Sequence, residues 1–134
     1  SRTLLHLACE NGHTDVIRFL AGNRCHLNPR DKDKRTPLMT AIQYGHKDCV
    51  ATLLELGAQT ELRDGVGNTA LHLAALVKSK CLVELLLEHN AHIDALNKLG
   101  RTPLAEAICI RCKEMVELLL QKGADVNARL RNGR

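Results

Sequence analysis

The sequence predicts an all-α repeat solenoid, an elongated and curved stack of helix-turn-helix units joined by extended, hairpin-like loops. A period of 33 residues carries this prediction, because Thr recurs at that spacing with Leu two places later and Ala five places later. The columns are Thr3, Thr36, Thr69 and Thr102, then Leu5, Leu38, Leu71 and Leu104, then Ala8, Ala41, Ala74 and Ala107. The repeats run approximately over 2–34, 35–67, 68–100 and 101–134, which makes the 134 residues one domain.

Composition supports a packed aliphatic core. Hydrophobic residues make up 45% of the chain, and Phe19 and Tyr44 are its only aromatic residues. This composition excludes a disordered chain and leaves no aromatic platform on which bases could stack. No run approaches the roughly 20 apolar residues of a membrane-spanning helix, so we expect no transmembrane segment. The six cysteines are scattered among helical patterns, which is typical of reduced thiols in the cytoplasm or nucleus.

Each repeat has the local signals of two helices followed by a loop. The periodic Thr is an N-cap residue, and Pro37 or Pro103 occupies the first helical position, where its missing N–H costs nothing. Gly12 and Gly45 end the first helix after about two turns. A second, amphipathic helix is predicted over segments such as 48–56 and 114–121, and a turn-rich stretch such as 124–127 leads to the next Thr.

Three positions depart from this pattern and predict strained turns. Lys78 and Arg111 stand where the first two repeats have the helix-ending glycine. Arg24 stands where later repeats have Gly or Asn at the end of the second helix. A left-handed backbone at a residue other than glycine costs on the order of 1 kcal/mol, so we expect these turns to weaken the fold.

The repeat unit resembles the ankyrin repeat, whose signature is a T-P-L-H-x-A motif in a period of this length. The motif stands as Thr3-Leu4-Leu5-His6, Thr36-Pro37-Leu38-Met39, Thr69-Ala70-Leu71-His72 and Thr102-Pro103-Leu104-Ala105. The order of variants is similar to the POTE-like group, which joins ankyrin repeats to a coiled coil. That likeness implies that the chain is part of a longer parent, which oligomerises through the coiled coil while this part alone is a monomer.

The residues give no support for catalysis or for a cofactor. Cys109 and Cys112 have the spacing of a zinc-ligand pair, but no second pair follows at a suitable distance. No nucleophile elbow, phosphate-binding loop or zinc-protease motif occurs, so we expect a non-enzymatic domain without cofactor or metal. The ankyrin resemblance implies that His6 and His72 hydrogen-bond the loops between repeats.

The resemblance places the partner-binding surface on the concave face, which the loop tips and the exposed ends of the first helices form. By register this face comprises 25 positions that hold 10 of the 19 cations and two of the 15 anions, Glu10 and Asp33. Its expected apolar anchors are Tyr44, Leu76, Val77, Leu99 and Ile110, and its expected basic residues include Arg30, Lys32, Arg35, Arg63, Lys98 and Arg101. We therefore expect a protein-interaction scaffold that binds a protein or peptide segment, acidic and with apolar anchors of its own.

Other interpretations of the same residues stay open. The cations could be solvated and without function, and Leu76 and Ile110 could be buried by a neighbouring loop. The basic face could bind nucleic acid, the less favoured partner, or anionic lipid, with steep salt dependence. Asn28 and Asn127 each follow a Leu by eight places, which resembles the ankyrin-repeat substrates of asparaginyl hydroxylase.

Overall fold

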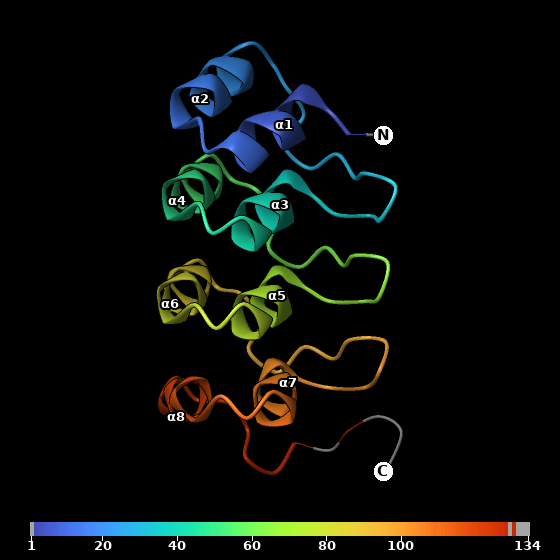
Figure 1. Cartoon of the computed structure of the whole chain (residues 1–134), viewed down its shortest axis with the longest axis vertical. Coiled ribbons are helices and arrows are strands. Elements are labelled where there is room, and N and C mark those ends of the chain that lie inside the picture. The colour runs from blue at the N-terminus through green and yellow to red at the C-terminus, as the bar shows by residue number, and fades with distance from the viewer. Residues whose placement is uncertain (1, 129, 131–134) are drawn as a thin grey trace.

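The computed structural model describes residues 2–128 and 130, and these form eight helices and no strands. The helices are α1 (Leu4–Asn11), α2 (Thr14–Gly22), α3 (Pro37–Gln43), α4 (Lys47–Glu55), α5 (Ala70–Leu76), α6 (Lys80–Glu88), α7 (Pro103–Cys109) and α8 (Lys113–Gln121). The odd-numbered helices stack in one column, the even-numbered helices stack in a second, and the loops between pairs project on the odd-numbered side (Figure 1). The predicted all-α repeat solenoid is confirmed.

Each odd-numbered helix begins at a threonine whose side chain caps it. The hydroxyls of Thr3, Thr36, Thr69 and Thr102 accept hydrogen bonds from the backbone N–H groups of His6, Met39, His72 and Ala105, respectively. At Thr3 and Thr69 the histidine side chain also bonds back to the cap residue, which completes a capping box. The periodic Thr therefore sets the first residue of four helices by satisfying an otherwise unpaired N–H.

Small side chains let the helices of neighbouring pairs approach closely. The periodic alanines are all buried, with at most 5% of their surface exposed. Cys9 and Cys49 lie in the same core as compact apolar fillers, and burial raises the pKa of the Cys9 thiol to about 12. The core runs continuously through the stack of helix pairs, as a solenoid requires.

The strained turns occur where the sequence predicts them. Lys78 has φ of 60°, Arg111 has φ of 57° and Arg24 has φ of 64°, all in the left-handed region. Gly12 and Gly45, the register equivalents of Lys78 and Arg111, have φ of 75° and 73°. The turn geometry is thus common to all pairs, and only two pairs have a glycine where the backbone favours one.

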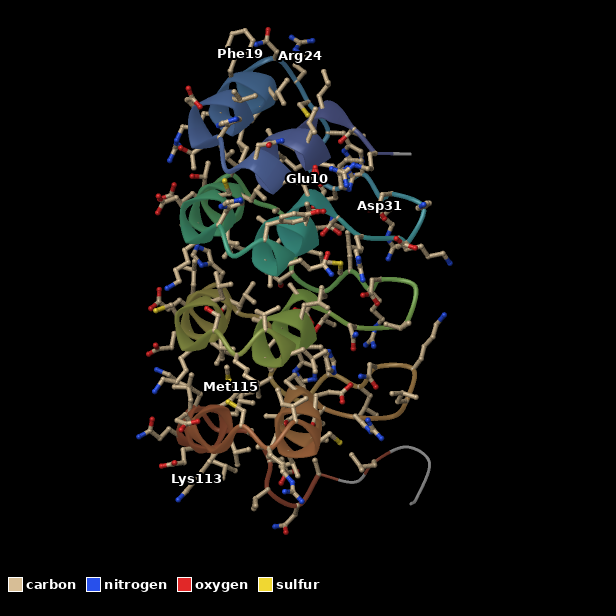
Figure 2. All side chains as sticks on the ribbon, in the orientation of Figure 1. Glu10, Phe19, Arg24, Asp31, Lys113 and Met115 are labelled. Atoms are coloured by element: carbon tan, nitrogen blue, oxygen red, sulfur yellow. The ribbon has the colours of Figure 1, made fainter. Side chains whose placement is uncertain are left out.

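The first helix pair exposes apolar side chains that the later pairs bury. Leu4 is 71% exposed and Phe19 is 70% exposed, and Phe19 projects outward at the end of the stack that α1 and α2 form (Figure 2). At the position of Leu4, the later pairs carry Pro37, Ala70 and Pro103, all buried. Each pair therefore gains this burial from the pair stacked before it. Among the described residues, no helix is both long and apolar enough to cross a membrane.

Candidate interaction face

The loop tips and the C-terminal ends of α1, α3, α5 and α7 form one surface, which we call the loop face (Figure 1). It is the surface that the sequence assigns to partner binding. The predicted residues that are exposed are Arg30, Lys32, Tyr44, Arg63, Val77, Lys98 and Leu99, and those that are half-buried are Arg35, Leu76, Arg101 and Ile110. Leu76 and Ile110 are thus partly exposed, so neither full exposure nor full burial under a loop describes them.

An acidic or amide side chain shapes each described loop tip. Asp31 Oδ1 accepts hydrogen bonds from the backbone N–H groups of Asp33 and Arg35, both at 2.9 Å. Asp64 and Asn97, one and two periods later, accept the equivalent pairs of N–H groups. These bonds hold each tip in a fixed turn, so the side chains on the tips occupy defined positions.

Three of the predicted basic residues brace one loop against the next. Arg30 Nη2 donates to the carbonyl oxygen of Arg63 at 2.7 Å, and Arg63 Nη1 donates to the carbonyl oxygen of Leu96. Lys98 Nζ donates to the carbonyl oxygen of Gly65 at 2.8 Å. The acceptors are uncharged carbonyls that hold these side chains in place, and none of the described ion pairs includes any of the three. Sequence reasoning missed this role, although Arg30 and Arg63 lie one period apart.

The histidines connect repeats, as the resemblance implies. The Nε2 atom of His6 lies 2.8 Å from the carbonyl oxygen of Arg35, and that of His72 lies 2.9 Å from the carbonyl oxygen of Arg101. The Thr69 N–H points to His72 Nδ1, so the Nε2 atom carries the proton that His72 donates to the Arg101 carbonyl. Burial lowers the pKa of His72, because the neutral ring suits this environment.

A buried polar network joins two loops to α7. Glu106 is only 6% exposed, and its carboxylate lies 3.3 Å from Arg101 Nη1 and accepts from Asn97 Nδ2 at 2.7 Å. Asn97 Nδ2 also donates to Asn68 Oδ1 at 2.9 Å. Arg101, a predicted partner-binding residue, therefore already has a carboxylate partner within the chain. The signal that could have revealed the network is an acidic residue at position 106, where the other repeats carry Leu or Thr.

A cavity of about 310 Å³ opens on the loop face between the first two repeats. It is lined by Arg2, Asp31, Lys32, Asp33, Arg35, Thr40, Gln43 and Tyr44. At its rim the Tyr44 hydroxyl donates to Glu10 Oε1 at 2.9 Å, and Arg2 pairs with Glu10 Oε2 at the same distance. The hydrogen bond to Glu10, and then the Glu10 charge, raise the pKa of Tyr44. Glu10 lies on α1, and Asp31 lies on the loop between α2 and α3 (Figure 2).

The loop face is less one-sidedly basic than its register-based count indicates. That count omitted Asp31, which lines the cavity, and Glu106, which pairs with Arg101. Four positions included in the count, Arg129, Arg131, Asn132 and Arg134, lie outside the described residues. Within the described part of the chain, no group of three or more His, Cys, Asp or Glu residues is arranged to hold a metal ion.

The two asparagines proposed for hydroxylation differ in environment. Asn28 is half-buried, and its Oδ1 atom accepts a hydrogen bond from the Gln59 N–H at 3.0 Å. Glu61 and Asp94, one and two periods later, accept from the next loop in the same way. Asn127 occupies this column at the end of the stack and is exposed. Sequence reasoning missed that the column connects neighbouring loops.

The stacked helix pairs and their common loop face define the class of protein, a helical repeat solenoid that presents one continuous surface. A family model described as ankyrin repeats (3 copies) matches residues 1–64 and again residues 56–129. Because the two matches together cover most of its length, the chain belongs to the ankyrin repeat family. Members of this family are generally non-enzymatic protein–protein interaction modules.

Proposed function

We propose that the loop face binds an acidic partner segment that carries apolar side chains. The observation that carries the proposal is the row of braced cations, Arg30, Arg63 and Lys98, whose partners are neutral carbonyls. Side chains already held in place lose little entropy when a ligand binds, and charged donors favour carboxylates. An acidic segment lying across the loop tips would meet fixed positive charge from three successive loops.

Apolar side chains on the same face supply the anchors. Tyr44, Val77 and Leu99 expose 53%, 42% and 57% of their surfaces. Covering exposed apolar surface contributes about 25 cal/mol per Å², so a partner with Leu or Ile between its acidic residues gains affinity here. The half-buried Leu76 and Ile110 add smaller areas to this contact.

Fluorescence anisotropy with two labelled peptides tests the proposal. One peptide alternates Glu with Leu, and the other replaces every Glu by Gln. We expect the first to bind more tightly and the Val77→Glu, Leu99→Glu double variant to weaken its binding by about tenfold or more. The Val16→Glu, Phe19→Glu double variant is the matched control, because it adds the same two negative charges at exposed apolar sites on α2. Unchanged binding by the folded double variant would show that the anchors are misplaced.

The salt dependence of binding separates this function from an electrostatic surface for nucleic acid or anionic lipid. Single-stranded DNA or phosphatidylserine vesicles would lose affinity steeply with salt and would ignore Val77 and Leu99. Glu10, Asp31 and Asp33 on the loop face repel phosphates and carboxylates alike, so the exposed apolar anchors are what favour the peptide. Tight, salt-sensitive DNA or vesicle binding together with no peptide binding would refute the proposal.

Hydroxylation of asparagine is a second proposed role, and the exposure of Asn127 favours that site over Asn28. An intact-mass increment of about 16 daltons, one oxygen atom, located on Asn127 in protein isolated from cells would support it. Protein from cells that express the hydroxylase but show no increment would dismiss it. We also propose, from the sequence resemblance, a POTE-like intracellular parent that oligomerises through a coiled coil.

A further inference from the structure

Two sites two periods apart share a backbone geometry but differ in three of four equivalent side chains. In the fourth repeat Glu106 contacts Arg101 and Asn97, and Asn97 contacts Asn68. The register equivalents of these four residues, in the order 106, 101, 97 and 68, are Thr40, Arg35, Asp31 and Arg2. The second repeat therefore keeps the arginine of this network and has a shorter, uncharged side chain in place of its carboxylate.

The four equivalent residues line one cavity. Arg2, Asp31, Arg35 and Thr40 are all among the residues around the space of about 310 Å³ on the loop face. A threonine side chain is shorter than a glutamate side chain, so part of the volume that Glu106 fills in the fourth repeat is open here. The cavity thus lies at the position where the chain itself places a carboxylate in another repeat.

The arginine in this cavity lacks the partners that its equivalent has. Arg35 Nε is buried and has no hydrogen-bond partner among the described residues, and none of the described ion pairs includes Arg35. Arg101, by contrast, pairs with Glu106. A buried donor without an acceptor is costly, so a ligand that brings an acceptor to this guanidinium gains binding energy.

Charge around the cavity singles out Arg35. The charged lining residues, Arg2, Lys32, Arg35, Asp31 and Asp33, carry one net positive charge, and Arg2 already pairs with Glu10 at the rim. Asp31 and Asp33 are the unfavourable neighbours in the lining, and Asp31 stands at the position from which Asn97 donates to Glu106 in the fourth repeat's site. Oδ1 of either residue accepts the same two backbone N–H groups, so Asp31→Asn retains the turn while removing the negative charge.

We propose that this cavity is a carboxylate-binding pocket and that it receives a glutamate side chain of the acidic partner segment, held by Arg35. The pocket rests on the proposed function and assigns one partner side chain a position within it. The glutamate carboxylate would lie beside Arg35 as the Glu106 carboxylate lies beside Arg101. Tyr44 and Gln43 stand at the same cavity and offer polar atoms to the adjoining peptide.

NMR of the arginine Nε–H groups in ¹⁵N-labelled protein tests the pocket directly. The probe is N-acetylglutamate N-methylamide, whose only charge is the side-chain carboxylate, and the control probe is its glutamine counterpart. We expect the Arg35 signal, identified by its loss in Arg35→Lys, to shift with the glutamate probe at millimolar concentrations. The control probe should leave it unchanged. Arg101 is an internal control, because Glu106 already occupies it.

Two variants sharpen the test. Asp31→Asn should tighten binding of the glutamate probe by about threefold to tenfold, because it removes the repelling charge. The Asp31→Asn, Thr40→Glu double variant places in the second repeat the side chains that stand at positions 97 and 106. It should abolish the response by supplying an internal carboxylate. N-acetylleucine, with a terminal carboxylate, distinguishes a side-chain site from one for a chain end.

The results separate this pocket from the broader proposal. If the Glu–Leu peptide binds but neither it nor the glutamate probe shifts Arg35, the pocket is refuted and the loop-face function stands. Equal shifts with the glutamate and glutamine probes, or a stronger response to N-acetylleucine, would also overturn the assignment. A clear Arg35 response to the glutamate probe without peptide binding would keep the pocket and refute the extended interface. Circular dichroism of each variant confirms that it is folded.

Discussion

The turns at Lys78 and Arg111 allow the free-energy cost of a left-handed backbone at a residue other than glycine to be measured within one protein. Both residues are exposed with φ near 60°, and the described residues give neither side chain a hydrogen bond or ion pair. Replacing each by glycine removes strain of about 1–2 kcal/mol, while the freer unfolded chain takes back about 0.4–1 kcal/mol. We expect each variant to gain about 0.5–1 kcal/mol, and the double variant about 1–2 kcal/mol.

The reverse substitution at Gly45 is the matched control. A Cβ atom added at Gly45 meets no atom within 4 Å, so Gly45→Lys introduces the left-handed strain and no clash. Gly12 is unsuitable, because its added Cβ atom would lie 2.9 Å from His46 Nδ1. Gly45→Lys should therefore lose about as much stability as Lys78→Gly gains.

Urea unfolding followed by far-ultraviolet circular dichroism measures these changes, since the chain has no tryptophan. The midpoint should rise for Lys78→Gly and Arg111→Gly with the slope unchanged, and it should fall for Gly45→Lys. Hydrogen exchange should show the gain concentrated in the helix pairs that adjoin each turn, because neighbouring repeats unfold semi-independently. Equal stability of all three variants and the parent chain would refute the strain argument.

Three further predictions follow from burial. The pKa of His72 is lowered in the folded chain, so below about pH 6.5 the unfolded chain binds a proton at His72 more readily than the folded chain does. The free energy of unfolding should therefore fall as pH drops from 7 toward 5. His72→Met should reduce the change of the urea midpoint with pH, and a variant whose midpoint changes with pH as much as that of the parent chain would contradict this. Cys81 should react quickly with a thiol reagent and buried Cys9 only on unfolding, as mass spectrometry of labelled peptides would show. Asn97→Asp should cost about 2–4 kcal/mol in urea unfolding by facing Glu106 with a second carboxylate, and Glu106→Gln should rescue it.

The sequence predicted the fold because the same local signals for caps, helices and turns recur in every repeat. The Thr cap and the left-handed turn at Lys78 follow from rules that act within a few residues of the chain. Because the period is constant, each helix packs against its counterpart in the next repeat. A correct prediction for one repeat therefore also predicts how the repeats stack. The expected second helix over 48–56 differs from the observed α4 by one residue at each end.

The site was harder to predict, because its contacts depend on how neighbouring loops pack and not on spacing in the sequence alone. Arg30 was expected to be available for a partner, but its bond to the Arg63 carbonyl depends on how two loops approach each other. The pairing of Arg101 with Glu106 needed the direction of a side chain that enters the interface between repeats. Composition and spacing give the identity of such residues, whereas their partners follow only from the packed loops.

We expect departures from the repeat, more than its constant columns, to mark the partner-binding positions of this protein. The constant columns form the caps, the alanine contacts and the turns, which every helix pair needs. At the column of Thr40 and Glu106 the residue type changes while the backbone stays the same, and only Glu106 pairs with the arginine of its site. Glu106 completes its site within the chain, whereas Thr40 leaves Arg35 without a carboxylate in a cavity that faces solvent. The paired site of Glu106 and Arg101 is therefore the model for our proposal, in which a partner supplies the carboxylate that the second repeat lacks.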